Sequence, residues 1–235
     1  MHLSRLPLIT GCAAVSLAVA LSLAASAGCA RNTGDFDAPV VGVELPFGGR
    51  DAADGLHARE GIELALGDWN ATHKAFVRAR YRDSGLHLQN PHLDEGEDPV
   101  GEPERAASIA QDFVRDAAVV AIVGGLRQEV VLAEARYTGP GGVALVSGGA
   151  ARGASGVVFA ALDTSALTRD PAFLAHFHQR NMEAASQEAL RFYAATLLVL
   201  EAIARSDGTR EGVLNALDAR CPSGACPAPA PLAAK

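Results

Sequence analysis

The chain has 235 residues, enough for one large or two small domains with a sizeable buried core. Its 27 acidic and 20 basic side chains give a formal net charge of −7, and no basic stretch of the kind that DNA-binding proteins carry is visible. Hydrophobic residues make up 49% of the chain, which is ordinary for an α/β domain. We therefore expect no nucleic-acid partner.

Residues 1–28 are predicted to be a signal peptide. After a positive charge, residues 13–27 form an apolar run that is too short for a good membrane span and ends in small residues. Two cleavage patterns fit: residues 25–27 (Ala-Ser-Ala) match ordinary secretion, whereas residues 26–29 (Ser-Ala-Gly-Cys) resemble a bacterial lipobox that would place a lipid on Cys29. Both predict export to the periplasm or cell envelope, and an uncleaved apolar anchor is the remaining alternative.

The first elements after this leader alternate between strand and helix. The apolar residues 40–45 predict a buried strand, and a helical period of apolar residues follows over residues 56–69. Apolar and basic residues alternate over residues 76–81, which is typical of a strand near the edge of a sheet. The acidic stretch 83–101 is rich in Pro and Gly and predicts a loop.

A second series of strands and helices follows that loop. Pro103 suits the first turn of a helix, and the continuous apolar run 118–123 suits the centre of a parallel sheet. A helix is predicted over residues 128–137 and a strand over residues 142–147. This alternation requires a parallel sheet with right-handed crossovers, so the expected fold class of residues 38–155 is α/β, an open parallel sheet with helices on both faces.

Residues 156–220 are expected to pack on or beside this first lobe. One more strand is predicted at residues 156–161, and Thr209 is placed to cap the last helix. Residues 221–235 end in alternating Pro and Ala and are predicted to be a disordered tail. Three helices are predicted, over residues 171–180, 186–205 and 209–219.

Cys221 and Cys226 are the two cysteines that remain beyond the leader and Cys29. Two thiols are too few for a zinc site unless histidines join them, and a short-loop disulfide is expected in an oxidising compartment. His176 and His178 lie two residues apart on a predicted helix and therefore point to different faces. The sequence thus predicts a local disulfide and no metal site.

No motif of a catalytic centre is found. The Gly-rich residues 47–50 lack the Gly-Lys-Ser/Thr of a phosphate loop, and the chain has no Gly-x-Ser-x-Gly elbow. The acidic residues 94–98 lack the alternating spacing of a calcium loop. An enzyme on a parallel sheet would need a nucleophile or an acid pair at Gly124 or Ser147, and none is convincing. We expect a protein that is not an enzyme and uses no cofactor.

The first strand, its turn and the following helix contain residues 41–46 (Val-Gly-Val-Glu-Leu-Pro), Gly49, Gly55, Gly61 and Asn70. With these residues at these spacings, the segment resembles the start of the Leu/Ile/Val-binding family of periplasmic proteins, which have the type I fold. In that family glycines let the helix lie close to the sheet, and an Asn serves as its terminal cap.

Two further blocks, residues 106–150 and 156–217, resemble the ligand loops and the C-terminal helices of the same family. The resemblance implies a substrate-binding protein of a branched-chain-amino-acid-type ABC transporter. Such a protein binds a small polar solute, for example an amino acid, and delivers it to the importer permease. Contact with the membrane would be made only through a lipid anchor.

The resemblance also implies where the ligand binds. In the family, two loops at the carboxyl ends of parallel strands hold the α-carboxylate and α-ammonium groups of an amino acid, and such loops suit an anionic group. The family usually has Ser or Thr in the first loop, where this chain has charged residues. Two alternatives remain open: the charged residues of the first loop are simply solvated, and Ser147 with Gly148 and Gly149 forms a plain turn from strand to loop. The implied ligand-binding residues are Asp54, Arg127, Gln128, Glu129, Ser147, Gly148, Gly149, Ala150 and Ala151.

The chain departs from the family in length as well. The family has two lobes that close on the ligand, and most of a second lobe is missing here. A single lobe leaves half of a ligand in water, which costs affinity. A sensory or protein-interaction module of the same fold, or a decayed truncated copy, therefore remains an alternative to transport.

Overall fold

The computed structural model describes residues 38–85, 101–149, 158–161, 163–222, 224–227, 229, 231 and 232. The predicted signal peptide with Cys29 lies outside these residues, and so do Ala150 and Ala151 of the second predicted ligand loop. Within the described helices, none combines the length and the apolar composition that crossing a lipid bilayer requires.

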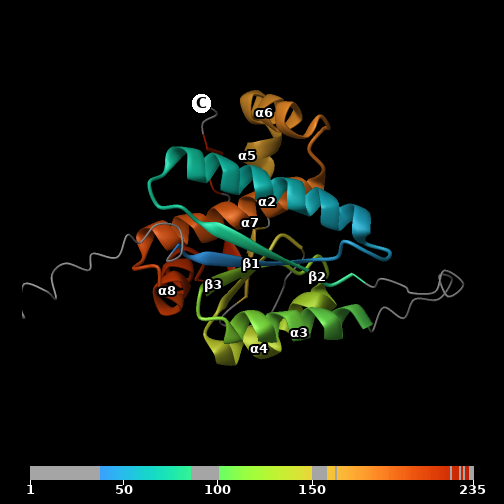
Figure 1. Cartoon of the computed structure of the whole chain (residues 1–235). Helices are drawn as coiled ribbons and strands as arrows, with labels where there is room; N and C mark the ends of the chain where they lie inside the picture. The colour runs from blue at the N-terminus through green and yellow to red at the C-terminus, as the bar shows by residue number, and fades with distance from the viewer. Residues whose placement is uncertain are drawn as a thin grey trace, which may run out of the picture. The chain divides into compact units, whose positions relative to one another are not determined.

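One parallel sheet of six strands forms the centre of the described residues, in the order β2-β1-β3-β4-β5-β6 (Figure 1). All of its strand pairs are parallel. The predicted open parallel sheet is thus confirmed, with the alternating strand β2 at its edge as expected. The strands are β1 (Val40–Leu45), β2 (Arg78–Asp83), β3 (Val119–Val123), β4 (Ala144–Ser147), β5 (Val158–Ala161) and β6 (Ala225–Cys226).

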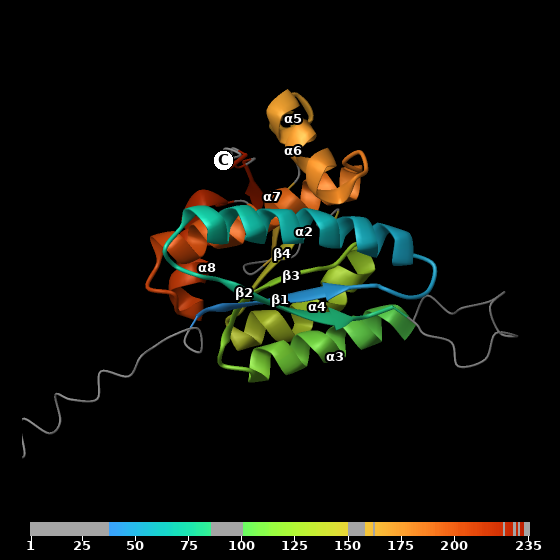
Figure 2. The ribbon, with the colours of Figure 1, turned by 45° about the horizontal axis from the view of Figure 1, so that its top comes forward.

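Helices cover both faces of this sheet, as Figures 1 and 2 show. One face carries α2 (Ala52–Thr72), α7 (Gln187–Arg205) and α8 (Arg210–Arg220). The other face carries α3 (Gly101–Arg115) and α4 (Gln128–Gly141). Because both faces are covered, every residue of β1, β3 and β4 is buried, which explains why these strands are apolar apart from Glu44 and Ser147.

Two short elements precede α7 in the chain, α5 (Ser165–Thr168) and α6 (Pro171–Asn181). Asp170 caps α6 by accepting the N–H groups of two residues in its first turn. Thr209 caps α8 by accepting the N–H of Gly212, which confirms its predicted role. The helix α5 was not expected, since four residues carry no helical period.

Gly61 and Asn70 have different roles from those that the resemblance implied. A Cβ at Gly61 would lie 2.0 Å from the carbonyl oxygen of Ala189, so this glycine brings α2 against α7 and not against the sheet. Asn70 does not end α2, which continues to Thr72. Its side-chain amide instead donates to the carbonyl oxygen of Val77 and accepts the N–H of Val77, each at 2.9 Å, and so ties α2 to the start of β2.

Arg210, the first residue of α8, joins three elements through its guanidinium. It donates to the carbonyl oxygens of Phe113 and Val114 at the end of α3, of Asp116 in the turn, and of Val119 in β3. Carbonyls at a helix end lack partners within the helix, so one cation stabilises several of them at once.

Part of the segment that was expected to be disordered is folded. Cys221 and Cys226 form a disulfide with their Cα atoms 4.7 Å apart, and both cysteines are buried. The two residues of β6 pair with β5, and the Ala160 N–H donates to the carbonyl oxygen of Gly224. The prediction of disorder for residues 221–235 is wrong at this point, because the sheet edge and the disulfide order a sequence that has no periodicity of its own.

Candidate functional site

Three connections meet at the carboxyl edge of the sheet. The strands β1, β3 and β4 are parallel neighbours and end at this edge, where the chain leaves them toward α2, toward α4 and into the loop at Gly148 and Gly149. Gln128 follows β3 and Ser147 ends β4, so the two predicted ligand loops lie on a common rim, as expected.

A hollow of about 110 Å³ opens at this rim. Its walls come from α2, from the connection between β3 and α4, from the loop after β4, and from the first turns of α7. Asp54, Arg127, Gly148 and Gly149 of the predicted set lie in the wall. The nine lining residues are Asp51, Asp54, Leu126, Arg127, Gly148, Gly149, Glu188, Arg191 and Phe192.

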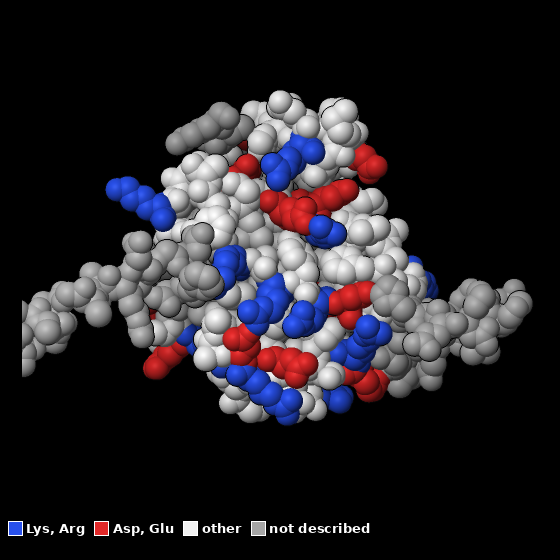
Figure 3. Space-filling model, viewed as in Figure 1, with Lys and Arg blue, Asp and Glu red and all other residues white. Residues whose placement is uncertain are grey.

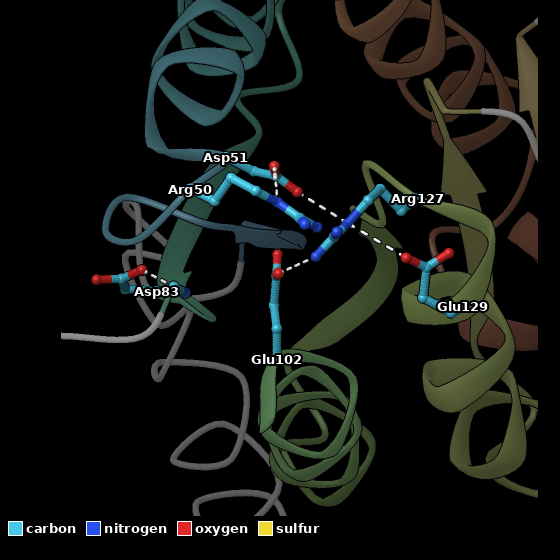
Figure 4. A network of polar contacts seen from close by, with 7 residues as sticks. Arg50, Asp51, Asp83, Glu102, Arg127 and Glu129 are labelled. Carbon is cyan, nitrogen blue, oxygen red and sulfur yellow. Dashed lines mark hydrogen bonds and ion pairs between the residues drawn. The ribbon is translucent and has the colours of Figure 1, made fainter. Parts of the chain in front are cut away.

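Arg127 is the centre of a charged network beside the hollow (Figure 4). Its Nε lies 2.8 Å from Oδ2 of Asp51 and 3.4 Å from Oε1 of Glu129, and its Nη2 contacts the carboxylate of Glu102. Only 21% of the Arg127 side chain is exposed. These partners belong to the starts of α2, α4 and α3, so one guanidinium joins three helix N-termini whose partial positive charges attract carboxylates.

Burial is the main cause that raises the pKa of Glu102, to about 7, and the negative charges of Asp51, Glu44 and Glu129 add to it while Arg50 opposes it. The direct contact with Arg127 favours the charged carboxylate as well. Above a pH of about 7 the carboxylate is ionised, so the ion pair with Arg127 is complete in that range.

Ser147 holds the two loops together from inside the protein. Its hydroxyl donates to the carbonyl oxygen of Gly125 at 2.7 Å and accepts the N–H of Gly149 at 2.9 Å, and the side chain is fully buried. A Cβ at Gly149 would lie 2.4 Å from the carbonyl oxygen of Leu126, so only glycine permits this approach of the loops. Ser147 therefore shapes the wall of the hollow without lining it.

The other predicted ligand residues lie elsewhere. Gln128 and Glu129 begin α4 and do not line the hollow, although Glu129 reaches Arg127. Sequence reasoning missed Asp51 and Leu126, which are neighbours of predicted residues. It also missed Glu188, Arg191 and Phe192, which α7 brings in from the C-terminal part; two charged residues in the first turns of a long apolar helix were the available signal.

Two carboxyl groups lie beneath the first loop. Glu44 of β1 and Glu134 of α4 are fully buried, and Oε2 of Glu44 accepts the N–H of Gly125 at 3.0 Å. Burial raises the pKa of both groups, and for Glu134 the charge of Glu44 adds to this effect. The loop that leads to Arg127 is thus attached to a buried acid pair.

The hollow is suited to non-covalent binding of a charged solute. Its lining side chains include no hydroxyl, thiol or imidazole. Across the described part of the chain, no group of three or more His, Cys, Asp or Glu side chains could hold a metal ion. On the face drawn in Figure 3, basic and acidic side chains are interspersed, and no extended basic surface for nucleic acid lies there.

No protein-family model matches the sequence, and no curated protein matches it significantly. Solved structures do match the fold. An open parallel sheet with its hollow at the carboxyl edge is the fold of the type I periplasmic binding proteins, the substrate-binding components of ABC transporters, and the expected resemblance of the fold is confirmed.

Three solved structures illustrate the likeness. A branched-chain amino acid ABC transporter protein from Rhodospirillum rubrum has 16% identity and a TM-score of 0.62, covering 78% of this chain and 89% of that one. LivJ from Streptococcus pneumoniae, in complex with isoleucine, has 13% identity and a TM-score of 0.60, covering 77% and 88%. The leucine-binding protein LivK from Thermotoga maritima has 11% identity and a TM-score of 0.58, covering 77% and 87%. At these identities the likeness establishes the fold.

Proposed function

We propose that this chain is an extracytoplasmic solute-binding protein of a branched-chain-amino-acid-type ABC transporter. The observation that carries the proposal is the hollow at the carboxyl edge of the sheet, where the loops after β3 and β4 meet α2 and α7. Open parallel sheets bind ligands at this edge. The solved structures with the same fold, which include transporter proteins described with isoleucine and with leucine, support the choice of class.

The ligand is a small polar solute such as an amino acid. Five of the nine lining residues carry a charge, and only Leu126 and Phe192 contribute large apolar side chains. A space of about 110 Å³ suits a small molecule, because about 10–15 Å³ of space measured in this way holds one water molecule. In the second loop, Gly148 lines the hollow with its backbone. Ala150 and Ala151 are the remaining proposed ligand-binding residues of this loop.

The remaining parts of the proposal concern the place and the partner of the protein. The apolar leader exports the chain to the periplasm or cell envelope, and Cys29 is the position for a lipid anchor. The partner is the permease of the importer. Mass spectrometry of the protein from its native host distinguishes a cleaved, lipidated Cys29 from cleavage after residue 27.

Titration calorimetry of the whole chain with a panel of amino acids tests solute binding. We expect heat for at least one member, and Leu126→Trp to remove it, because the larger ring fills the hollow. Leu132→Trp is the matched control: Leu132 lies on α4 with 44% of its surface exposed and is not part of the lining. No heat from any member, or equal effects of the two substitutions, would contradict the proposal.

The alternative to transport is a sensory or protein-interaction module of the same fold, or a decayed truncated copy. The observation in its favour is that the described residues contain one sheet, and therefore one lobe, where a transport receptor closes two lobes on its ligand. Co-purification with permease and ATPase subunits would support the transport function. Stable self-association without solute binding would favour the module.

A further inference from the structure

The charges around the hollow divide into those that are paired and those that are not. Arg127 is neutralised by Asp51, Glu102 and Glu129. Together with Arg50, which contacts Asp51 at 3.4 Å, this network sums to one net negative charge. The N-termini of α2, α3 and α4 each contribute about half a positive charge at the same place, so the network as a whole attracts neither sign strongly.

Three charged side chains in the lining have no such partner. Asp54 lies in the first turn of α2, and Glu188 and Arg191 lie one helical turn apart at the start of α7. None of the three forms a hydrogen bond or an ion pair with another described residue. The full negative charges of Asp54 and Glu188 are larger than the partial positive charges at the N-termini of α2 and α7, where these side chains lie. The hollow therefore offers two negative groups and one positive group to a ligand.

The ligand that complements this arrangement carries the opposite charges, which are two positive groups and one negative group. We propose that the hollow binds a basic amino acid, with its α-carboxylate on Arg191 and its two positive groups on Asp54 and Glu188. A guanidinium pairs with a carboxylate through two parallel hydrogen bonds, which makes Arg191 the residue that orients the ligand. The inference rests on the proposed function and goes beyond it by naming the ligand class.

The aliphatic amino acids fit the hollow less well. Burying a branched side chain requires an apolar wall, and the lining provides Leu126 and Phe192 against five charged side chains. Leucine and isoleucine have one positive group, the α-ammonium, so they would leave either Asp54 or Glu188 stripped of water beside an uncharged chain with no pairing in return. The same lining is therefore selective against leucine and isoleucine.

Calorimetry of the whole chain with lysine, arginine, leucine, glutamate and putrescine tests the ligand class. We expect lysine and arginine to bind at least tenfold more tightly than leucine and glutamate. Putrescine has both amines and no carboxylate, so it should bind at least tenfold more weakly than lysine. Leucine that binds as tightly as lysine would overturn the inference while leaving the proposed function intact, and no heat from any solute would count against both.

Substitutions assign the three contacts. Asp54→Asn and Glu188→Gln should each weaken lysine binding about tenfold, and Arg191→Gln should weaken lysine about tenfold while leaving putrescine unchanged or tighter. The controls are Asp218→Asn on α8 and Arg205→Gln at the far end of α7, neither of which lines the hollow. Arg191→Lys should restore part of the lysine affinity. Loss of lysine and putrescine binding to the same extent in Arg191→Gln would overturn the carboxylate assignment.

Discussion

Glu44 in β1 and Glu134 in α4 form a pair of carboxyl groups in a part of the core where neither side chain is exposed, and each shifts the pKa of the other. Two interacting carboxyl groups in a buried site repel each other when both are ionised, so one of them holds a proton. Burial is the main cause that raises the pKa of Glu44, the negative charge of Asp83 adds to it, and no cation is among the groups that shift this pKa. The first loop of the hollow is attached to this pair through the N–H of Gly125.

Glu134→Gln should flatten the dependence of stability on pH. Burial raises the pKa of Glu134 well above its ordinary value of 4.5, so the folded chain holds a proton that the unfolded chain releases. The stabilisation is therefore complete below about pH 4.5 and is lost as the pH rises toward the folded-state pKa, with a slope of up to about 1.4 kcal/mol per pH unit. Urea unfolding from pH 5 to pH 8 measures this slope.

In Glu134→Gln the amide donates to Glu44 at every pH, so one titrating proton is removed. Glu102 has a raised pKa as well and contributes in the same direction, but it is unchanged in this variant. Glu211→Gln on α8 serves as the exposed control. The interpretation fails if Glu134→Gln and the natural chain lose stability equally steeply.

Arg127→Ala should destabilise the protein by about 1–3 kcal/mol, because it removes the cation that contacts all three carboxylates and leaves Arg50, which contacts only Asp51 among them. Urea unfolding at pH 8, where these carboxylates are charged, measures the loss. Arg115→Ala is the matched control: its pair with Asp112 is 67% exposed on both sides, and its loss should stay below about 0.5 kcal/mol. Equal losses in the two variants would show that the network does not stabilise the rim.

Gly61→Ala and Gly67→Ala should have opposite effects although both lie in α2. A Cβ at Gly61 would meet the carbonyl oxygen of Ala189 at 2.0 Å and push α7 away, which should cost about 1–3 kcal/mol. A Cβ at Gly67 meets nothing closer than Nη2 of Arg180 at 3.9 Å, so the higher helix propensity of alanine should stabilise by up to about 1 kcal/mol. Thermal or urea unfolding of the two variants measures these changes in stability. A loss of stability in Gly67→Ala as large as that in Gly61→Ala would contradict this account.

Reduction of the Cys221–Cys226 disulfide should lower stability by about 2 kcal/mol, the value expected for a short closed loop. The melting temperature should fall by several degrees, and the amide of Ala160, which donates to Gly224, should exchange faster. The double variant Cys221→Ser with Cys226→Ser should not respond to reductant. A melting temperature that reductant leaves unchanged in the natural chain would show that β6 is held without the disulfide.

Much of the fold could be predicted because its signals are local. The continuous apolar run of β3, and that of β1 up to Glu44, indicate burial on both faces, which requires helices on both sides of a parallel sheet. The capping role of Thr209 is visible because it involves a residue three positions away. The order of strands and helices then leaves few topologies, so the common rim of the two loops followed as well.

The hollow itself depended on the tertiary structure. The sequence by itself determined the parallel sheet, since periodicity and connectivity are properties of neighbouring residues, and its resemblance to a known family placed Asp54, Arg127, Gly148 and Gly149 near the rim. Only the packing of α7 against α2 through Gly61 brings Glu188 and Arg191 to that rim, and only long-range contacts pair β6 with β5. Such contacts are set by which surfaces fit together across the chain, and no local pattern encodes that fit.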